Sequence, residues 1–305
     1  MARNKDGSVA LALKKANDDP GLREFFDREV KNLQMLTKYK SIHLFKPIAA
    51  YEHRGDRCLL FPWAEGGNLA EYWSRNSGFS LTKVELAWIF GQLTGLFGAL
   101  EELHAGNCRH GDLKPENILL LIDLDKKMTL QIADLGHTAF HDLEAATNIR
   151  RAHEIYTKTP PGTSRYEPPE MEMGRDKNRS TCEARSRAYD VWSMGCVVLE
   201  LLIWLSYGFD TVSKFRDETA YLWEWERVNK KKQYRVQREA QRYIKALYTT
   251  WQEPSAWKEL LTLVETRLLL VDVSEDWNIS SIGYRETAAA AHRQMRITQR
   301  KYYSV

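Results

Sequence analysis

The stretch H-G-D-L-K-P-E-N-I-L-L, residues 110–120, carries the polar side chains of this chain that are most readily tied to chemistry. Asp112 and Asn117 lie five positions apart, and Lys114 lies between them. An Asp and an Asn at this spacing, taken alone, belong to a turn more often than to a site. The stronger indication of a site is their order relative to the flanking strands and to a lysine far upstream, Lys14.

Two strand-like runs follow at once, 118–122 and 128–132, and Asp134 comes directly after the second. Phosphoryl transfer requires that phosphates are held, that metal ions are fixed against them, and that an acceptor hydroxyl is aimed in line. Carboxylate and amide oxygens are the ligands that Mg²⁺ prefers, and lysines neutralise phosphate charge. The residues available for these tasks are Asp112, Lys114, Asn117, Asp134 and Lys14.

Length and composition are those of an ordinary globular protein. A chain of 305 residues suits one large domain or two closely packed lobes, and 43% hydrophobic residues are ample for a core. The formal net charge of +3 gives no argument for nucleic acid or membranes, so we expect neither as a partner. The basic residues between Lys230 and Arg238 are flanked by glutamates and are interpreted as a solvated helix face.

The cysteines and the apolar runs indicate the cellular compartment in which the protein is expected. The four cysteines are Cys58, Cys108, Cys182 and Cys196. Their spacing fits neither a zinc site nor a disulfide framework, which favours a reducing compartment. The chain opens on charged residues without a signal peptide, and its longest apolar run, 196–205, is too short to span a bilayer. We expect a protein of the cytoplasm or nucleus.

The first part of the chain is rich in predicted strands, at 9–14, 46–53 and 57–62, with a helix from Leu22 to Leu36 among them. Glu29 falls inside the apolar stripe of that helix. An ionised carboxylate on a buried face is costly unless a cation meets it. From this helix alone, Glu29 is either such a paired carboxylate or a residue at the edge of the stripe.

The character of the sequence changes at the connector P-W-A-E-G-G-N, residues 62–68. After it, a long helix is predicted over 88–103 with Gly106 as its C-cap, and a buried central helix over 189–204. The basic tail, 279–305, is interpreted as the last packing helix, with a partner-binding role as the alternative. The pattern predicts an α+β fold with a small strand-rich part and a larger, mainly helical part.

These motifs, in this order, resemble those of the eukaryotic protein kinase family from about residue 9 to residue 272. D-L-G, residues 134–136, is similar to the family's D-F-G, and G-T-S-R-Y-E-P-P-E, residues 162–170, to the end of its activation segment. H-G-D also occurs in small-molecule kinases, but those lack an activation segment. The run D-L-K-P-E-N is typical of the serine/threonine type, and the style of the motifs is fungal-like.

The resemblance implies a bilobal fold, with a partial N-lobe over 1–61, a hinge over 62–68 and a C-lobe over 69–305. It implies transfer of phosphate from ATP, with Mg²⁺, to a serine or threonine of a protein substrate. Asp112 would be the base and Lys114 the charge stabiliser, with Thr163 hydrogen-bonded to both. Asn117 and Asp134 would hold the metal.

The resemblance also implies how the nucleotide is held. Lys14 would pair with Glu29, which supplies the cation that the apolar stripe requires, and anchor the phosphates. Adenine would bond the Pro62 carbonyl and the Ala64 backbone. Phe61 would guard the back of the pocket, and Leu119 would form its floor. Asp190, in the central helix, would brace the backbone of the catalytic loop.

Three departures from the family pattern bear on activity. Gly111 stands where many kinases carry an arginine that holds a phosphorylated loop residue, so activation need not depend on loop phosphorylation. Arg109 is the candidate substitute for that arginine. The loop phosphosites it could serve are Thr157, Thr159 and Ser164.

The second departure concerns Glu170, whose family partner is an arginine in a D-P-x-x-R motif. The corresponding run, D-V-S-E-D at 272–276, has none, so the pairing is expected to use another cation, such as Arg267, or to be lost. The third departure is the absence of the glycine-rich loop that precedes the corresponding lysine in the family. Only thirteen residues, Met1–Leu13, precede Lys14 here, with the single glycine Gly7. We expect either a chain cut or mis-started at its N-terminus or a natural short form.

Two main hypotheses follow. One is a protein serine/threonine kinase, favoured because every catalytic residue type is present in order. The other is a pseudokinase that acts as a binding or scaffolding module, favoured by the absent loop and the altered pairing of Glu170. A small-molecule kinase is the weaker third reading, and the oligomeric state is left open.

Overall fold

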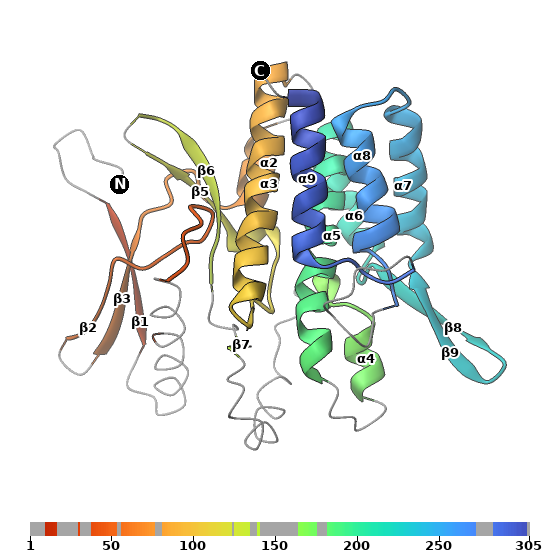
Figure 1. The fold of residues 1–305 in the computed structure, drawn as a ribbon, viewed down its shortest axis with the longest axis horizontal. Coiled ribbons are helices and arrows are strands. Elements are labelled where there is room, and N and C mark those ends of the chain that lie inside the picture. The colour runs from red at the N-terminus through yellow and green to blue at the C-terminus, as the bar shows by residue number, and fades with distance from the viewer. Residues whose placement is uncertain are drawn as a thin grey trace.

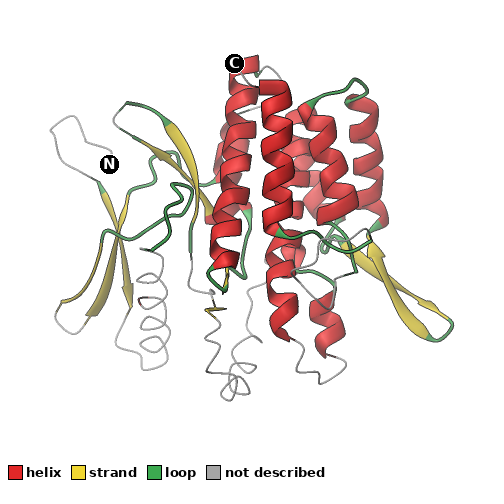
Figure 2. Ribbon diagram, in the orientation of Figure 1, coloured by secondary structure: helices red, strands yellow, loops and turns green. Residues whose placement is uncertain are grey.

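The computed structural model describes residues 10–16, 30, 38–53, 56–76, 81–123, 125–134, 139–140, 164–175, 182–272 and 283–303. Over these residues a small strand-rich part lies beside a larger part built mainly of helices (Figures 1 and 2). This arrangement confirms the predicted α+β fold class. The boundaries at 61, 62–68 and 69 stay predictions.

The small part contains an antiparallel sheet with the strand order β1-β3-β2. Its strands are β1 (Leu11–Ala16), β2 (Ala49–His53) and β3 (Asp56–Pro62), each within three residues of its predicted bounds. In the register, Lys14 lies opposite Leu59, and Ala12 lies opposite Phe61. The helix predicted over 22–36 lies outside the described residues apart from Val30.

The connector leads from β3 into α2 (Leu69–Arg75). Gly67 has φ +74°, a left-handed conformation that favours glycine, and Asn68 caps α2 through a capping box with Glu71. The Gly66 amide donates to the Leu120 carbonyl at 3.1 Å, and the Leu120 amide donates to the Gly67 carbonyl at 2.8 Å. The connector is thereby fixed against β5 (Ile118–Ile122).

Two long helices form the centre of the larger part. Helix α3 (Lys83–Ala105) begins at a Thr82 capping box and ends at Gly106, as predicted. Helix α5 (Cys182–Tyr207) is the predicted central helix, and its Trp204 indole donates to the Trp73 carbonyl of α2 at 3.0 Å. Among the described residues, the stretch 187–207 is long and apolar enough to cross a membrane, but 94% of the 18 residues in its apolar window are buried inside the protein. Packing in the core accounts for its apolar composition.

The other described elements complete the larger part. In chain order they are β4 (Cys108–Arg109), the 3₁₀ turn η2 (Pro115–Asn117), β6 (Met128–Ile132), β7 (Ala139–Phe140), η5 (Ser164–Tyr166), α4 (Glu170–Arg175), α6 (Phe209–Glu218), β8 (Trp223–Val228), β9 (Lys231–Val236), α7 (Arg238–Thr250), α8 (Ala256–Leu263), the π-helical turn η6 (Val264–Leu268) and α9 (Ala288–Tyr303). Helix α9 lies alongside α3 (Figure 1), so the basic tail does form the last packing helix.

The interpretation of the basic run as a helix face is wrong. Strands β8 and β9 pair as an antiparallel hairpin that projects from the helices (Figure 1). Its turn residues, Asn229 and Lys230, have φ values of 51° and 65°, the left-handed pair that matches strand twist in tight hairpins. The hairpin is attached to the body of the protein by the Trp223 indole, which donates to the Glu167 carbonyl at 2.8 Å.

Candidate active site

The predicted catalytic loop begins after β4 and is held by one buried carboxylate. Asp190, fully buried in α5, accepts hydrogen bonds from the His110 amide at 2.9 Å and the Gly111 amide at 2.8 Å. Its Oδ2 also lies 2.9 Å from Nε2 of His104. Burial acts to raise the pKa of Asp190, but the hydrogen bond and charge of His104, together with the charge of His110 and the Gly111 amide, outweigh it and hold that pKa below its ordinary value. The predicted bracing of the loop by Asp190 is confirmed.

Gly111 has a conformational role in this loop. Its φ of +82° lies in the left-handed region, which costs a residue with a side chain roughly 1–2 kcal/mol. This conformation lets two successive amides, of His110 and Gly111, reach the two oxygens of Asp190. Glycine therefore suits the left-handed backbone conformation at this position, although it lacks the arginine side chain that many kinases carry there.

The three predicted polar residues of the loop meet at one carboxylate. Oδ2 of Asp112 accepts from Nζ of Lys114 at 2.8 Å and from Nδ2 of Asn117 at 2.9 Å. Oδ1 of Asp112 is buried and has no hydrogen-bond partner among the described residues. An unpaired buried acceptor is costly, so this oxygen is the atom best placed to accept a hydrogen bond from the hydroxyl of a bound substrate.

The hydrogen bonds of the Asn117 side chain fix which of its atoms is left to bind a metal ion. Its Nδ2 donates to the Asp112 carbonyl at 2.8 Å as well as to the carboxylate. Since the amide nitrogen makes both contacts, the amide oxygen is the atom left to act as a ligand. Carboxylate and amide oxygens are a donor set that suits Mg²⁺, and Asn117 and Asp134 fit such an ion.

The end of β6 is joined to the loop by backbone contacts. The Ala133 amide donates to the Asn117 carbonyl at 2.8 Å, and Nε2 of His110 donates to the Ala133 carbonyl at 2.8 Å. Nδ1 of His110 accepts from the Asp112 amide at 3.2 Å, which fixes the proton of this ring on Nε2. Asp134, the next residue, is thereby positioned beside the loop.

Asp134 is also where the two parts of the fold meet. Nζ of Lys14, on β1, lies 3.4 Å from Oδ1 of Asp134, and both side chains are a little under half exposed. This pair brings the predicted phosphate anchor and a predicted metal ligand together. The ion pair predicted for Lys14 involves Glu29, which lies outside the described residues, as do Thr163, Leu135 and Gly136.

The residues predicted to hold the adenine lie along β3, the connector and β5. The ring of Phe61 stacks on Phe45, with 5.2 Å between centroids and 9° between planes. Pro62 ends β3 opposite Leu11, and the Ala64 carbonyl accepts from the Gly67 amide at 3.0 Å. Leu119 forms a β-bridge with Asn68, so it lies next to the end of the connector.

The suggestion of Arg267 as the cation is wrong, but another arginine does pair with Glu170, as the expectation of a substitute cation allowed. Arg285 reaches it with two hydrogen bonds, Nη1 to Oε1 at 2.5 Å and Nη2 to Oε2 at 3.0 Å, and both residues are buried. The guanidinium also lies over the Trp192 ring, 4.9 Å from its centroid. Arg267 instead lies 3.7 Å from Glu286. The pair is kept, but the arginine comes from a position that no motif spacing marks.

Arg109, the candidate substitute for an arginine at position 111, is 7% exposed, and its guanidinium lies over the Tyr189 ring at 5.7 Å. Of the candidate phosphosites, Ser164 lies in η5, whereas Thr157 and Thr159 lie outside the described residues. The structure therefore places Arg109 against α5.

Sequence reasoning missed a buried charge network beside the loop. Glu200 of α5 is fully buried and accepts from Nη2 of Arg216 at 2.6 Å and from the Tyr166 hydroxyl at 3.0 Å. Nη1 of Arg216 lies 3.6 Å from Oε1 of Glu116 in the loop. Glu200 inside the apolar run 196–205 was the available signal, because a carboxylate at that place needs a cation.

Comparison with known proteins identifies the family. The family model described as protein kinase domain matches residues 1–261, and the chain belongs to this family. Among curated relatives, it is 28% identical over 204 residues to homeodomain-interacting protein kinase 1 of Caenorhabditis elegans. It is 29% identical over 203 residues to cyclin-dependent kinase-like 4 of Mus musculus, and 29% identical over 190 residues to the probable serine/threonine-protein kinase HSL1 of Saccharomyces cerevisiae.

These matches cover 66%, 66% and 62% of this chain, but only 21%, 51% and 11% of the three relatives in the same order. The chain thus spans about half or less of the length of these relatives. The similarity concerns the kinase domain, and protein kinases as a class use ATP and act on proteins.

Proposed function

We propose that this chain is a protein serine/threonine kinase that transfers the γ-phosphate of ATP to a hydroxyl of a protein substrate. The observation that carries the proposal is the Asp112 carboxylate, with Lys114 and Asn117 on one oxygen and a buried, unpartnered second oxygen. This arrangement is what an acceptor hydroxyl needs beside it.

In the proposed step, the substrate hydroxyl donates its hydrogen bond to Oδ1 of Asp112. The hydroxyl oxygen forms a bond to the γ-phosphorus, the bond from that phosphorus to the ADP oxygen breaks, and the hydroxyl proton passes to Asp112. ADP leaves with the electron pair of the broken bond. Lys114, 2.8 Å from the carboxylate, neutralises charge on the transferred group.

The nucleotide would be held by residues from both parts of the fold. Lys14 would contact the phosphates, and Phe61, Pro62, Ala64 and Leu119 would surround the adenine. Mg²⁺, held by Asn117 and Asp134, would neutralise phosphate charge. The proposed roles of Glu29, in anchoring Lys14, and of Thr163, in hydrogen-bonding the loop, rest on the sequence resemblance alone.

Serine/threonine specificity is supported by Lys114, since tyrosine kinases usually lack a lysine there, and by similarity to relatives such as the probable serine/threonine-protein kinase HSL1 of Saccharomyces cerevisiae. Gly111 supports activation without a phosphorylated loop residue, because no arginine is available at that position. We propose the cytoplasm or nucleus as the location on the cysteine spacing described above.

The test is phosphate incorporation from radiolabelled ATP with Mg²⁺ into casein, with wild type and Asp112→Asn compared. Loss of the base is expected to lower the rate by about 10²–10⁴-fold. Asp210→Asn, an exposed aspartate in the first turn of α6, is the matched control and is expected to leave the rate unchanged. Phosphoamino-acid analysis of the product is expected to show phosphoserine and phosphothreonine.

Equal incorporation by wild type and Asp112→Asn would contradict the proposal. A second measurement separates binding from turnover, since a ligand that binds only the folded state raises the melting temperature. A rise with Mg·ATP but no incorporation would identify the pseudokinase alternative. Phosphotyrosine alone would contradict the serine/threonine assignment.

A further inference from the structure

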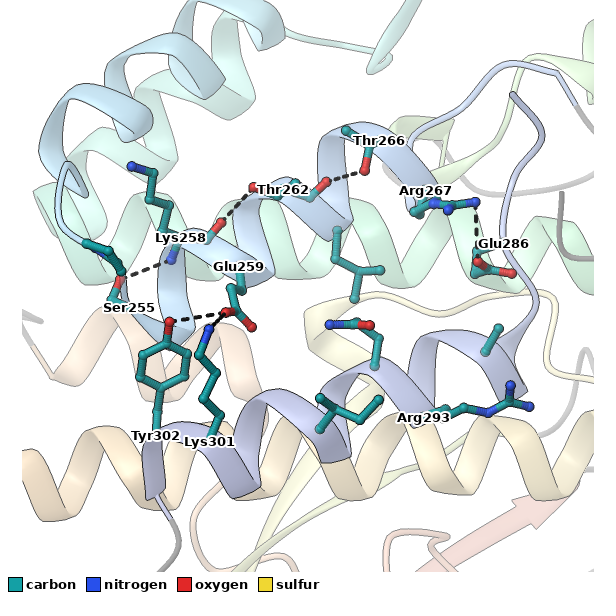
Figure 3. A pocket seen from close by; sticks show the side chains of 15 residues that line it. Ser255, Lys258, Glu259, Thr262, Thr266, Arg267, Glu286, Arg293, Lys301 and Tyr302 are labelled. Atoms are coloured by element: carbon teal, nitrogen blue, oxygen red, sulfur yellow. Dashed lines mark hydrogen bonds and ion pairs between the residues drawn. The ribbon is translucent and has the colours of Figure 1, made fainter. Parts of the chain in front are cut away.

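A groove of about 590 Å³ runs between α8 with η6 on one side and α9 on the other (Figure 3). None of its lining residues belongs to the catalytic loop, 110–117, or to the proposed nucleotide site. What it could bind is therefore a question separate from phosphoryl transfer. Its two ends and its middle differ in chemistry.

Both ends are closed by polar contacts between the two sides. At one end, Glu259 of α8 accepts from Lys301 at 2.6 Å and from the Tyr302 hydroxyl at 3.1 Å, as Figure 3 shows. At the other end, Arg267 of η6 lies 3.7 Å from Glu286, just before α9 (Figure 3). These contacts hold the helices at a fixed separation and leave the middle of the groove open.

The middle has an apolar surface on α9. Ile297 lines the groove and is 53% exposed, and Ala290 lies two turns before it on the same face of the helix. The opposite face of α9 is buried, with Ala291 and Met295 at 1% exposure or less. A single exposed Ile is ordinary on a protein surface, so what indicates a partner is its place in a groove together with the charges around it.

The charges of the groove are unbalanced in one direction. Its two carboxylates, Glu259 and Glu286, are each paired with a groove cation. Nζ of Lys258 donates to the Gln252 carbonyl, which leaves its charge uncompensated. Arg293, one turn before Ile297, has no ion-pair partner among the described residues, and Figure 3 shows no contact for it. The unmatched charge is positive and lies beside the exposed Ile.

We propose that this groove is the docking site of a partner protein, which it binds through an amphipathic helical segment carrying apolar side chains flanked by carboxylates. Two side-by-side helices leave a trough that accepts a third helix, with apolar anchors at spacings of three and four residues. Leucine-sized side chains would cover Ile297 and Ala290. Carboxylates would meet Arg293 and Lys258. This inference goes beyond the proposed activity and does not depend on it.

The test uses a fluorescein-labelled peptide of alanine, leucine and glutamate, helix-forming, with leucine and glutamate along one face. Fluorescence anisotropy at low salt is expected to show saturable binding to the 305-residue chain. Ile297→Asp and Arg293→Glu are each expected to weaken it about tenfold or more, as anchors at the centre of an interface do. Arg296→Glu, one turn from Arg300 and outside the groove, is the matched control and is expected to change binding little.

A charge swap makes the assignment specific. A peptide with lysine in place of glutamate is expected to bind Arg293→Glu better than wild type. A scrambled peptide of the same composition, without an apolar face, is expected not to bind. Circular dichroism and the melting temperature of each variant check that the fold is intact.

Four results would overturn the proposal: no binding of the acidic peptide by wild type, equal binding of the scrambled peptide, binding unchanged in both groove variants, or an effect of Arg296→Glu equal to theirs. Sedimentation and vesicle binding test the other occupants. A dimer that Ile297→Asp abolishes would assign the groove to a second copy of the chain. Groove-dependent binding only to vesicles of phosphatidylcholine with phosphatidylserine would assign it to a membrane surface.

Discussion

Arg285 and Glu170 lie 115 positions apart in the chain and form a two-point ion pair in which both side chains are buried. Arg285 also donates to the Leu270 carbonyl at 2.8 Å and to the Ala188 carbonyl at 3.0 Å. The pair therefore ties the start of α4 to α5 and to the chain before α9. Its buried charges make each partner dependent on the other.

The first prediction follows from that dependence. Arg285→Met is expected to lower the free energy of unfolding by about 3–5 kcal/mol, because it leaves Glu170 buried without a cation. Urea denaturation measures the change. Arg267→Met, which removes an arginine that is about one-third exposed, is expected to cost about 1 kcal/mol or less. A larger loss for Arg267 than for Arg285 would contradict the assignment.

The double variant Glu170→Gln with Arg285→Met refines this test. Removing both charges relieves the uncompensated carboxylate, so the double variant is expected to be more stable than Arg285→Met alone. Additive losses from the two substitutions would mean that they do not act on one interaction.

The second prediction concerns pH. The pKa of Asp190 is held below its ordinary value of 3.8, so its contribution to stability is present above that pH and is lost as pH falls through the folded pKa. The free energy of unfolding of wild type is expected to fall more steeply below about pH 5 than that of Asp190→Asn. Denaturation at a series of pH values measures the slopes.

His104→Gln is the milder companion variant for this measurement. It can keep a donor toward Asp190 but removes the imidazole whose charge helps lower that pKa. Its slope is expected to lie between those of wild type and Asp190→Asn. Identical slopes for all three proteins would show that Asp190 does not carry the acid dependence.

The third prediction concerns Gly111. Gly111→Ala is expected to lower the free energy of unfolding by roughly 1–2 kcal/mol because of the left-handed backbone, and Gly111→Asn by less. Gly91→Ala is the matched control. An added Cβ there meets only the end of the Gln299 side chain at 3.4 Å within a helix, so a gain of about 0.4–1 kcal/mol is expected. A loss at Gly91 as large as that at Gly111 would contradict the backbone explanation.

The fourth prediction separates function from stability at Lys14. Because Lys14 and Asp134 are both nearly half exposed, Lys14→Met is expected to change the free energy of unfolding by about 1 kcal/mol or less. Phosphate incorporation is expected to fall at least about tenfold, because a phosphate contact is lost. Lys15→Met, the neighbour on the other face of β1, pairs with Asp56 instead and is expected to keep activity. Equal activities of the two variants would remove Lys14 from the site.

Much of the fold was predictable because its signals are local. The hairpin strands were placed at 118–122 and 128–132, where β5 and β6 lie, since two apolar runs flank a polar turn. Helix α3 was recognised from its apolar period and from Gly106. Asp112, Lys114 and Asn117 belong to one short segment, and their order relative to the two strands and to Lys14 is what marks them as candidate site residues.

The hairpin at 223–236 was misread although its signal is also local. Trp223 and Trp225 alternate with glutamates along β8, a period of two that indicates a strand, and Tyr234 of β9 lies opposite Trp225. The many lysines and arginines of this run mask the period of two, because charge alone fits an exposed helix face as well as an exposed strand. Contacts with the body of the protein, such as Lys232 with Glu172 at 2.8 Å, then fix where the hairpin lies.

The sequence by itself determined the elements of this kinase domain and the residues of its catalytic loop, because side-chain period, caps and short spacings act over a few residues. Only the tertiary structure decided that Glu170 meets Arg285, that Lys14 meets Asp134, and that Glu200 is neutralised by Arg216. The first two contacts join residues 115 and 120 positions apart, and the third joins two consecutive helices, α5 and α6, whose packing no local pattern fixes. Burial makes a paired charge necessary, but which cation supplies it depends on how the helices pack.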